Sequence, residues 1–88
     1  MLIIHDPQAT LDYRWDWTAW LDGDTITAAT VTTPDASLTI TDVTRDDTTV
    51  SAWITGGTTG TTAHVRCHIT TAGGRQDDRT INLRVRDR

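Results

Sequence analysis

The chain has 88 residues, 36% of them hydrophobic, and a formal net charge of −4. This length allows one domain with a thin core, because so short a chain buries only about 60–65% of its unfolded surface. The negative charge and the interspersed arginines exclude the basic face that phosphate binding needs, so nucleic acid is not an expected partner. No segment approaches the roughly 18 apolar residues of a membrane span, so no membrane contact is expected.

The charged residues are of two types only, because all twelve acids are aspartates and all eight bases are arginines. Glutamate and lysine, which favour helices, are absent, whereas the twenty threonines favour strands. We therefore expect no helix longer than a single turn. The start of the chain lacks the basic segment and long apolar stretch of a signal peptide, which indicates synthesis in the cytoplasm without a secretion signal.

The first part of the chain predicts two extended segments. Residues 2–4 form a short apolar run that ends at Asp6 and Pro7, as in an edge strand or a docking arm. Alternate positions are then apolar, which predicts a strand with one buried face formed by Leu11, Tyr13, Trp15 and Trp17. Trp20 breaks this alternation, so we expect a bulge or bend near residues 18–19, before a tight turn at residues 22–24.

A weaker strand is expected over residues 25–33, before the turn at Pro34 and Asp35. Its inward positions are predicted to be Ile26, Ala28 and Val31.

Two further strands are expected in the middle of the chain. Leu38 and Ile40 begin the first, and Val43 has the wrong parity, which predicts a bulge or strand end near Asp42. After a turn at residues 45–47, a strand over residues 49–55 is predicted to place Val50, Ala52 and Ile54 on the face opposite Trp53.

The clearest signal is a β-hairpin over residues 63–86. Two runs of period two flank a turn-rich cluster at residues 71–78. The chain as a whole shows six or seven strands, spaced about 8 to 12 residues apart, which predicts an all-β antiparallel sandwich with Greek-key connections. A parallel sheet is excluded, because no segment can serve as a crossover helix.

The single cysteine, Cys67, lies near two histidines, an arrangement that suggests thiol–imidazole chemistry or a metal site. Strand geometry opposes both, because His64 and His68 project from the face opposite the thiol. The two imidazoles are separated by roughly 13 Å along the strand, too far to chelate one metal. We therefore expect a buried thiol and two exposed imidazoles, and a lone cysteine allows no internal disulfide.

The remaining polar clusters are typical of turns. Residues 22–24 and 46–47 resemble calcium ligands, but calcium sites need six or more oxygens, often with a bidentate glutamate, which this chain lacks. Ser37 and Ser51 do not lie in a nucleophile elbow, and the glycine-rich segment 56–60 lacks the lysine of a phosphate loop. We expect no catalytic, cofactor-binding or metal-binding residues and no cofactor.

Four tryptophans dominate the aromatic content of the chain. Trp15 and Trp17 are expected in the core. Trp20 and Trp53, which lie off the main parity, are the candidates for exposed contacts with another subunit, because tryptophan is enriched in binding hot spots.

Several segments together carry a family resemblance that covers nearly the whole chain. They are residues 6–7, 11–13, 15–21, 23–26, 50–62, 67–75 and 77–81. In this order they resemble a family of small bacteriophage virion proteins, described as fibre–tail adaptor or head–tail region proteins. The last two strands also resemble the final pair of bacterial Ig-like and fibronectin-type modules. Related Ig-like sequences often begin the penultimate strand with a tyrosine, where this chain has Thr62-Ala63-His64, so that stabilising feature is absent or replaced.

The resemblance implies an Ig-like β-sandwich and a non-enzymatic structural role in a phage particle, after synthesis in the host cytoplasm. The module would dock onto or bridge head, tail or fibre components, as an adaptor or a capsid decoration. Its partners would be other virion proteins (capsid, portal, tail or fibre subunits), and it would form a homo-oligomer or occur in many copies on a symmetric particle. Docking arms are expected at residues 1–8 and 84–88. The expected interaction residues are Leu2, Ile3, Ile4, Trp20, Trp53, Arg84 and Arg86.

Two other classes of function compete with this interpretation. The first is a carbohydrate- or receptor-binding Ig-like module that uses Trp20 or Trp53 as a sugar platform. The second is a very small enzyme or metalloprotein. A glycan panel read by tryptophan fluorescence separates the first from a docking module, and a metal assay addresses the second.

Overall fold

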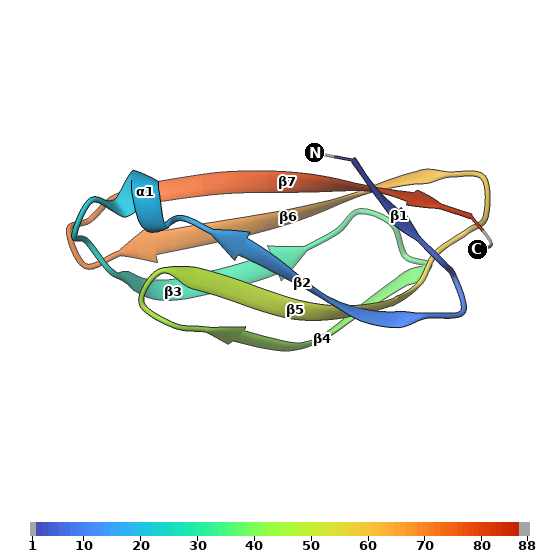
Figure 1. Cartoon of the computed structure of the whole chain (residues 1–88), viewed down its shortest axis with the longest axis horizontal. Coiled ribbons are helices and arrows are strands. Elements are labelled where there is room, and N and C mark those ends of the chain that lie inside the picture. Colours follow the sequence, from blue (N-terminus) through green and yellow to red (C-terminus); the bar gives the residue numbers. More distant parts are fainter. Residues whose placement is uncertain (1, 87–88) are drawn as a thin grey trace.

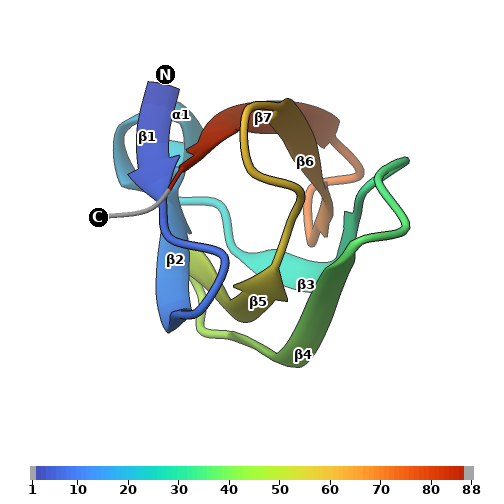
Figure 2. The same ribbon diagram turned by 90° about the vertical axis from the view of Figure 1, so that its right-hand side faces the viewer.

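The computed structural model describes residues 2–86 and arranges them as seven strands and one short helix (Figure 1). In chain order the elements are β1 (Leu2–His5), β2 (Thr10–Asp16), α1 (Thr18–Leu21), β3 (Ile26–Thr32), β4 (Leu38–Arg45), β5 (Thr49–Gly56), β6 (Thr62–Thr71) and β7 (Gln76–Val85). They form a four-stranded sheet of order β1-β7-β6-β3 and a three-stranded sheet of order β2-β5-β4. Viewed end-on, β7 and β6 lie on the opposite side of the molecule from β5 and β4 (Figure 2). The predicted all-β, sandwich-like class is confirmed.

The hairpin formed by β6 and β7 is also confirmed, but its turn is shorter than the expected 71–78, because residues 76–78 already belong to β7. Its strands pair antiparallel from Thr62 opposite Arg84 to Thr70 opposite Gln76. The inward positions alternate as predicted and are buried, which makes this hairpin one wall of the core: Ala63, Val65, Cys67, Ile69, Ile81, Leu83 and Val85.

One pair of strands corrects the expectation of an entirely antiparallel sandwich, although no wholly parallel sheet forms among residues 2–86. β1 runs parallel to β7, with Leu2 opposite Asn82 and His5 opposite Val85. Parallel neighbours need a long connection, but that connection need not be a helix. Here all the intervening strands make the connection, so a parallel pair forms without any crossover helix.

Two predicted irregularities have different outcomes. The ladder between β4 and β5 shifts register between Thr41 and Thr44, and Asp42 has a positive φ of 50°, so the bulge expected near Asp42 is confirmed. It leaves Val43 42% exposed. The irregularity expected near residues 18–19 is the single helical turn α1, which buries Leu21.

An unpredicted bulge in β3 makes one inward assignment wrong. The register of β3 against β6 shifts between Ile26 and Ala28. Because the shift inverts the alternation, Ala28 is exposed and Ala29 packs against the core in its place. Ile26 and Val31 lie inward as predicted.

The predicted core tryptophans are confirmed. Trp17 is fully buried and Trp15 is 3% exposed. On β5, the neighbour of β2 in the same sheet, the inward residues are fully buried as predicted: Val50, Ala52 and Ile54. The indole Nε1 of Trp17 donates a hydrogen bond of 2.9 Å to Asp77 on β7, which satisfies its polar group.

A buried histidine joins the two sheets at the β1 end. His5 is fully buried, and its Nδ1 lies 2.7 Å from the hydroxyl oxygen of Tyr13 on β2. Burial lowers the pKa of His5, although the Gly56 backbone and the Asp6 carboxylate act in the opposite direction. The neutral imidazole is therefore the form that suits the folded state.

This burial predicts a stability loss in mild acid. The unfolded state binds a proton near the ordinary value of 6.5, whereas the folded state resists it until lower pH. The free energy of unfolding should therefore fall as pH decreases from 6.5 toward the folded pKa, with a slope of at most about 1.4 kcal/mol per pH unit. Urea denaturation between pH 7.5 and 5 measures the slope, and the His5→Gln variant should flatten it. An unchanged slope in that variant would contradict the assignment to His5.

Candidate interaction surface

The two chain ends meet on one sheet edge. Ile4 lies opposite Arg84 in the parallel ladder between β1 and β7, and the amide of Arg86 donates to the carbonyl of His5 at 3.0 Å. Ile3 and Ile4 are half-buried, whereas Arg84 and Arg86 are exposed. Within residues 2–86 the segments expected as docking arms are thus adjacent strands, and Met1 and residues 87–88 lie outside the described residues.

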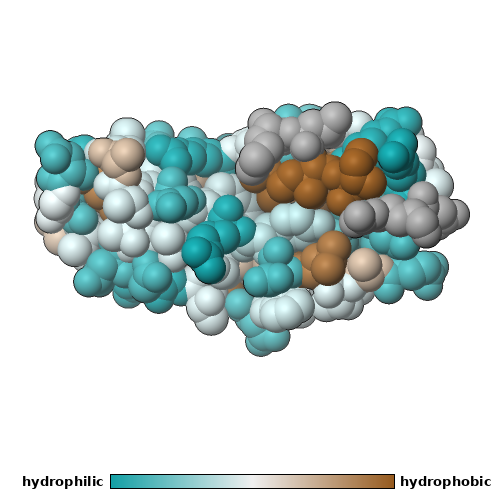
Figure 3. All heavy atoms as spheres, in the orientation of Figure 1, coloured by the Kyte–Doolittle hydropathy of each residue, from teal (hydrophilic) through white to brown (hydrophobic). Residues whose placement is uncertain are grey.

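An apolar patch accompanies this edge. In Figure 3, hydrophobic surface gathers over β1 and beside β2 on a face that is otherwise mainly polar. Ile3 packs against the core, and Ile4, one position along, has the opposite parity and lies opposite Arg84. Leu11 on β2 is half-buried as well. We call the group formed by Ile4, Arg84 and Arg86 the β1 edge surface.

The structure does not bring the two candidate tryptophans to this surface. α1, which carries Trp20, lies at one end of the molecule, and β1 lies toward the other end (Figure 1). Trp53 lies on β5, the central strand of the three-stranded sheet, between Asp12 and Thr41. It is 42% exposed, whereas Val50, Ala52 and Ile54 on the same strand are fully buried.

Trp20 already has a partner within the chain. The Arg75 guanidinium lies over its ring, 4.3 Å from the centroid. The same guanidinium donates to the carbonyl oxygen of Leu21 at 2.7 Å and contacts the Asp24 carboxylate at 3.3 Å. Trp20 is therefore half-buried under an arginine that also binds the end of α1, which leaves less of its ring for a partner.

The Asp24 carboxylate organises the loops at this end. It accepts the amides of Thr25 and Gly73 at 2.8 and 3.0 Å. These bonds, together with that of the Thr71 hydroxyl, which is the largest cause, lower the pKa of Asp24 to about 2. Asp24 thus joins its own turn to the turn between β6 and β7, a long-range role beyond the local turn that the sequence analysis expected.

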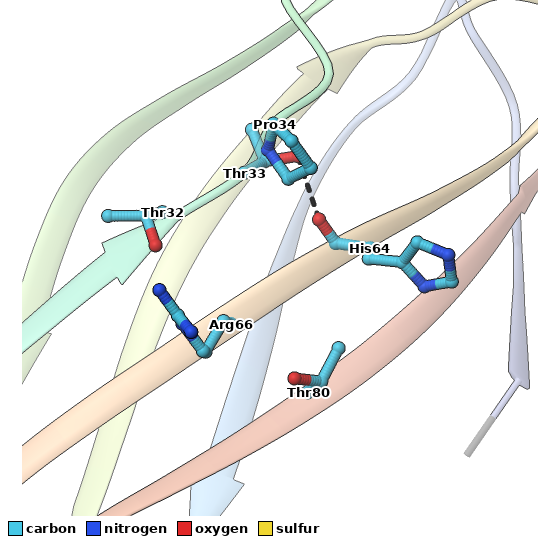
Figure 4. Close-up of a pocket in the computed structure, with 6 residues that line it drawn as sticks. All are labelled: Thr32, Thr33, Pro34, His64, Arg66 and Thr80. Carbon is cyan, nitrogen blue, oxygen red and sulfur yellow. Dashed lines mark hydrogen bonds between the residues drawn. The ribbon is translucent and has the colours of Figure 1, made fainter.

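The outer face of the four-stranded sheet carries a hollow that the sequence analysis missed. Thr32, Arg66 and Thr80 lie in a row across β3, β6 and β7. They line a depression of about 380 Å³ together with Thr33, Pro34 and His64. Figure 4 shows the Thr33 hydroxyl bonded to the His64 carbonyl, which ties the end of β3 to β6. Alternation placed Arg66 and Thr80 on the polar face, but only the strand register brings them together.

The environment of Cys67 agrees with the expected geometry. The thiol is fully buried, and burial raises its pKa to about 12, whereas His64 lies exposed on the opposite face.

Within the part of the chain that the structure describes, no three or more His, Cys, Asp or Glu side chains are grouped to hold a metal ion. No helix among residues 2–86 is long and apolar enough to cross a membrane.

Comparison with known proteins identifies a family. The model of a family described as podophage GP4 fiber-tail adaptor protein gp77 matches residues 5–84, which is most of the chain. No curated protein matches the chain.

The role of Arg75 can be tested by substitution. Arg75→Ala removes the stack on Trp20 and the bonds to the carbonyls of α1, so it should lower the free energy of unfolding by about 1–2 kcal/mol. Arg66→Ala, at an exposed position, should change it by less than about 0.5 kcal/mol. Urea denaturation of both variants measures the difference, and equal losses would contradict a special role for Arg75.

Proposed function

Because this chain belongs to the podophage GP4 fiber-tail adaptor protein gp77 family, we propose that it is a docking module that attaches a fibre to the phage tail. The match over residues 5–84 is the single observation that carries this proposal. The family is a structural one, so the protein is a virion component and not an enzyme.

An Ig-like topology is part of the proposal. β2, β5 and β4 correspond in order to strands B, E and D of an immunoglobulin sandwich, and β3, β6 and β7 correspond to C, F and G. β1 lies beside β7, at the edge of the second sheet. This order supports an Ig-like sandwich, a fold that presents edges and flat faces rather than a deep catalytic pocket.

The β1 edge surface is the contact that we assign to one partner. It combines a half-buried isoleucine, Ile4, with two exposed arginines, Arg84 and Arg86. An adaptor needs a second contact, and the elongated shape, with a long axis of 41 Å, separates the β1 edge surface from the α1 end. Many copies on a symmetric particle would add avidity to modest individual contacts.

A point substitution tests the β1 edge surface better than a deletion does. Removing residues 1–8 would delete β1 and the His5–Tyr13 contact, so loss of folding would obscure loss of docking. Ile4→Glu keeps the strand and places a carboxylate opposite Arg84, a favourable cross-strand pair.

We expect the Ile4→Glu protein to fold normally but to be incorporated into phage particles at least about tenfold less, the equivalent of about 1.4 kcal/mol. The control is Thr30→Glu, at an exposed position on β3, the other edge of the same sheet. Quantitative blotting of purified particles measures incorporation, and circular dichroism checks the fold. Equal incorporation of both variants would remove the β1 edge surface from the proposal.

Carbohydrate binding is kept as a second candidate because Trp53 is 42% exposed on an open sheet face. A docking module should show no change in tryptophan fluorescence across a glycan panel. A saturable change that disappears in the Trp53→Ala variant, while the Arg14→Ala variant keeps it, would favour the sugar-platform alternative instead.

A further inference from the structure

The sandwich has an open side between β2 and β7. A hollow of about 460 Å³ lies there, lined by Arg14, Trp15, Asp16, Arg79, Thr80 and Ile81. It is closed at one end by Arg79, whose guanidinium lies over the Trp17 ring and donates to the carbonyl of Asp16 at 2.6 Å. The hollow therefore has polypeptide edges as its walls and aromatic and aliphatic side chains within it.

Both walls are unpaired strand edges. β1 pairs with β7 only from Asn82 to Val85, so the part of β7 that precedes Asn82 has no strand on this side among residues 2–86. β2 is the edge strand of its sheet and pairs only with β5. Unpaired edges of this kind are sites where another chain can add a strand.

The backbone of β7 directs free hydrogen-bonding groups into the open side. Val85 bonds toward β6, because its amide donates to Thr61 and its carbonyl accepts from Gly60. Successive residues of a strand point their amide and carbonyl groups to opposite sides. Asp78 and Thr80 therefore point away from β6, toward the side on which Arg86 donates to His5.

The same argument applies to β2. The amide of Trp17 donates to Thr48, next to β5, so the backbone groups of Arg14 and Asp16 face outward. The bond from Arg79 to the Asp16 carbonyl agrees with this direction. The amide and carbonyl of Arg14 thus lie on the open edge.

Two side chains of β2 beside the hollow have polar groups without a partner among the described residues. Trp15 lines the hollow and is 3% exposed, yet its indole Nε1 has no hydrogen-bond partner in the described structure. A buried donor without an acceptor is costly, and native structures rarely leave one. Arg14, which precedes it and projects from the exposed face of β2, forms no ion pair among residues 2–86.

We propose that an extended segment of a fibre or tail protein adds to the free edge of β7, in line with β1, and presents an Asp or Glu side chain to Arg14. The proposal rests on the adaptor function above. The added strand supplies partners for the main-chain groups of Asp78 and Thr80, and its carboxylate faces the Arg14 guanidinium.

Hydrogen exchange tests the proposal without any substitution. The backbone amides of Asp78 and Thr80 should exchange at least about tenfold more slowly in phage particles than in the isolated protein. The outward amides of β3, an edge strand elsewhere, serve as the control and should not change. If the protein is present in particles while the β7 amides exchange at the free rate, strand addition is wrong and the adaptor function stands.

A matched pair of variants at Thr80 provides the second test. Thr80→Pro removes an outward amide, whereas Thr80→Val keeps it and alters only the side chain. Thr80→Pro should reduce incorporation into particles at least about tenfold relative to Thr80→Val, with melting temperatures that differ by less than about 5 °C. Equal incorporation of the two would overturn the proposal, and if Thr80→Pro fails to fold, hydrogen exchange decides.

A photo-crosslinker in place of Arg14 identifies the occupant. Crosslinks in particles to an acidic segment of a fibre or tail subunit are the expected result. Crosslinks between two copies of this chain would overturn the proposal, because the open edge would then be a self-association site. Absence of the wild-type protein from particles would instead count against the adaptor function itself.

Discussion

Trp17 is the point at which the two sheets are locked together. Its ring is fully buried, its indole donates to Asp77 across 60 positions of sequence, and Arg79 covers its face. The Arg79 guanidinium also donates a hydrogen bond to the Asp16 carbonyl. Asp77 and Arg79, both on β7, therefore bind the chain at the end of β2. A small sandwich buries little surface, so it matters that one large side chain contributes apolar burial, a hydrogen bond and a cation–π contact. The contacts of Trp17 also determine where the open side lies, because the edges of β2 and β7 separate beyond them.

The strands were predictable from sequence wherever burial repeats with period two. The inward residues of β5, β6 and β7 agree with the alternation, and the wrong parity of Val43 correctly indicated a bulge. The parallel pairing of β1 was not predictable, because it joins segments about 80 residues apart and leaves no local pattern. The bulge in β3 was not predicted from the sequence either, because alanine and threonine at neighbouring positions fit either face of a strand.

The candidate surfaces show the same limit. Sequence indicated which residues are exposed, such as Trp53 and Arg84, but it did not indicate that the two chain ends share one sheet edge. It also assigned Trp20 to the surface without detecting Arg75, which comes from a turn 55 residues later and covers the ring. The hollow at Trp15 depends on where β1 stops along β7, a tertiary property that no motif encodes.

The two ends of the molecule differ in how far they satisfy their own polar groups. At the α1 end, Asp24 and Arg75 bond to the loops and to each other. On the open side, by contrast, the edges of β2 and of the first part of β7 lack neighbouring strands among residues 2–86. A fold that contributes no catalytic chemistry to the particle can still direct assembly through such groups, because desolvation makes them favour one partner geometry over others. In an adaptor, the unsatisfied edge is therefore the part of the structure from which specificity for a fibre or tail segment can arise.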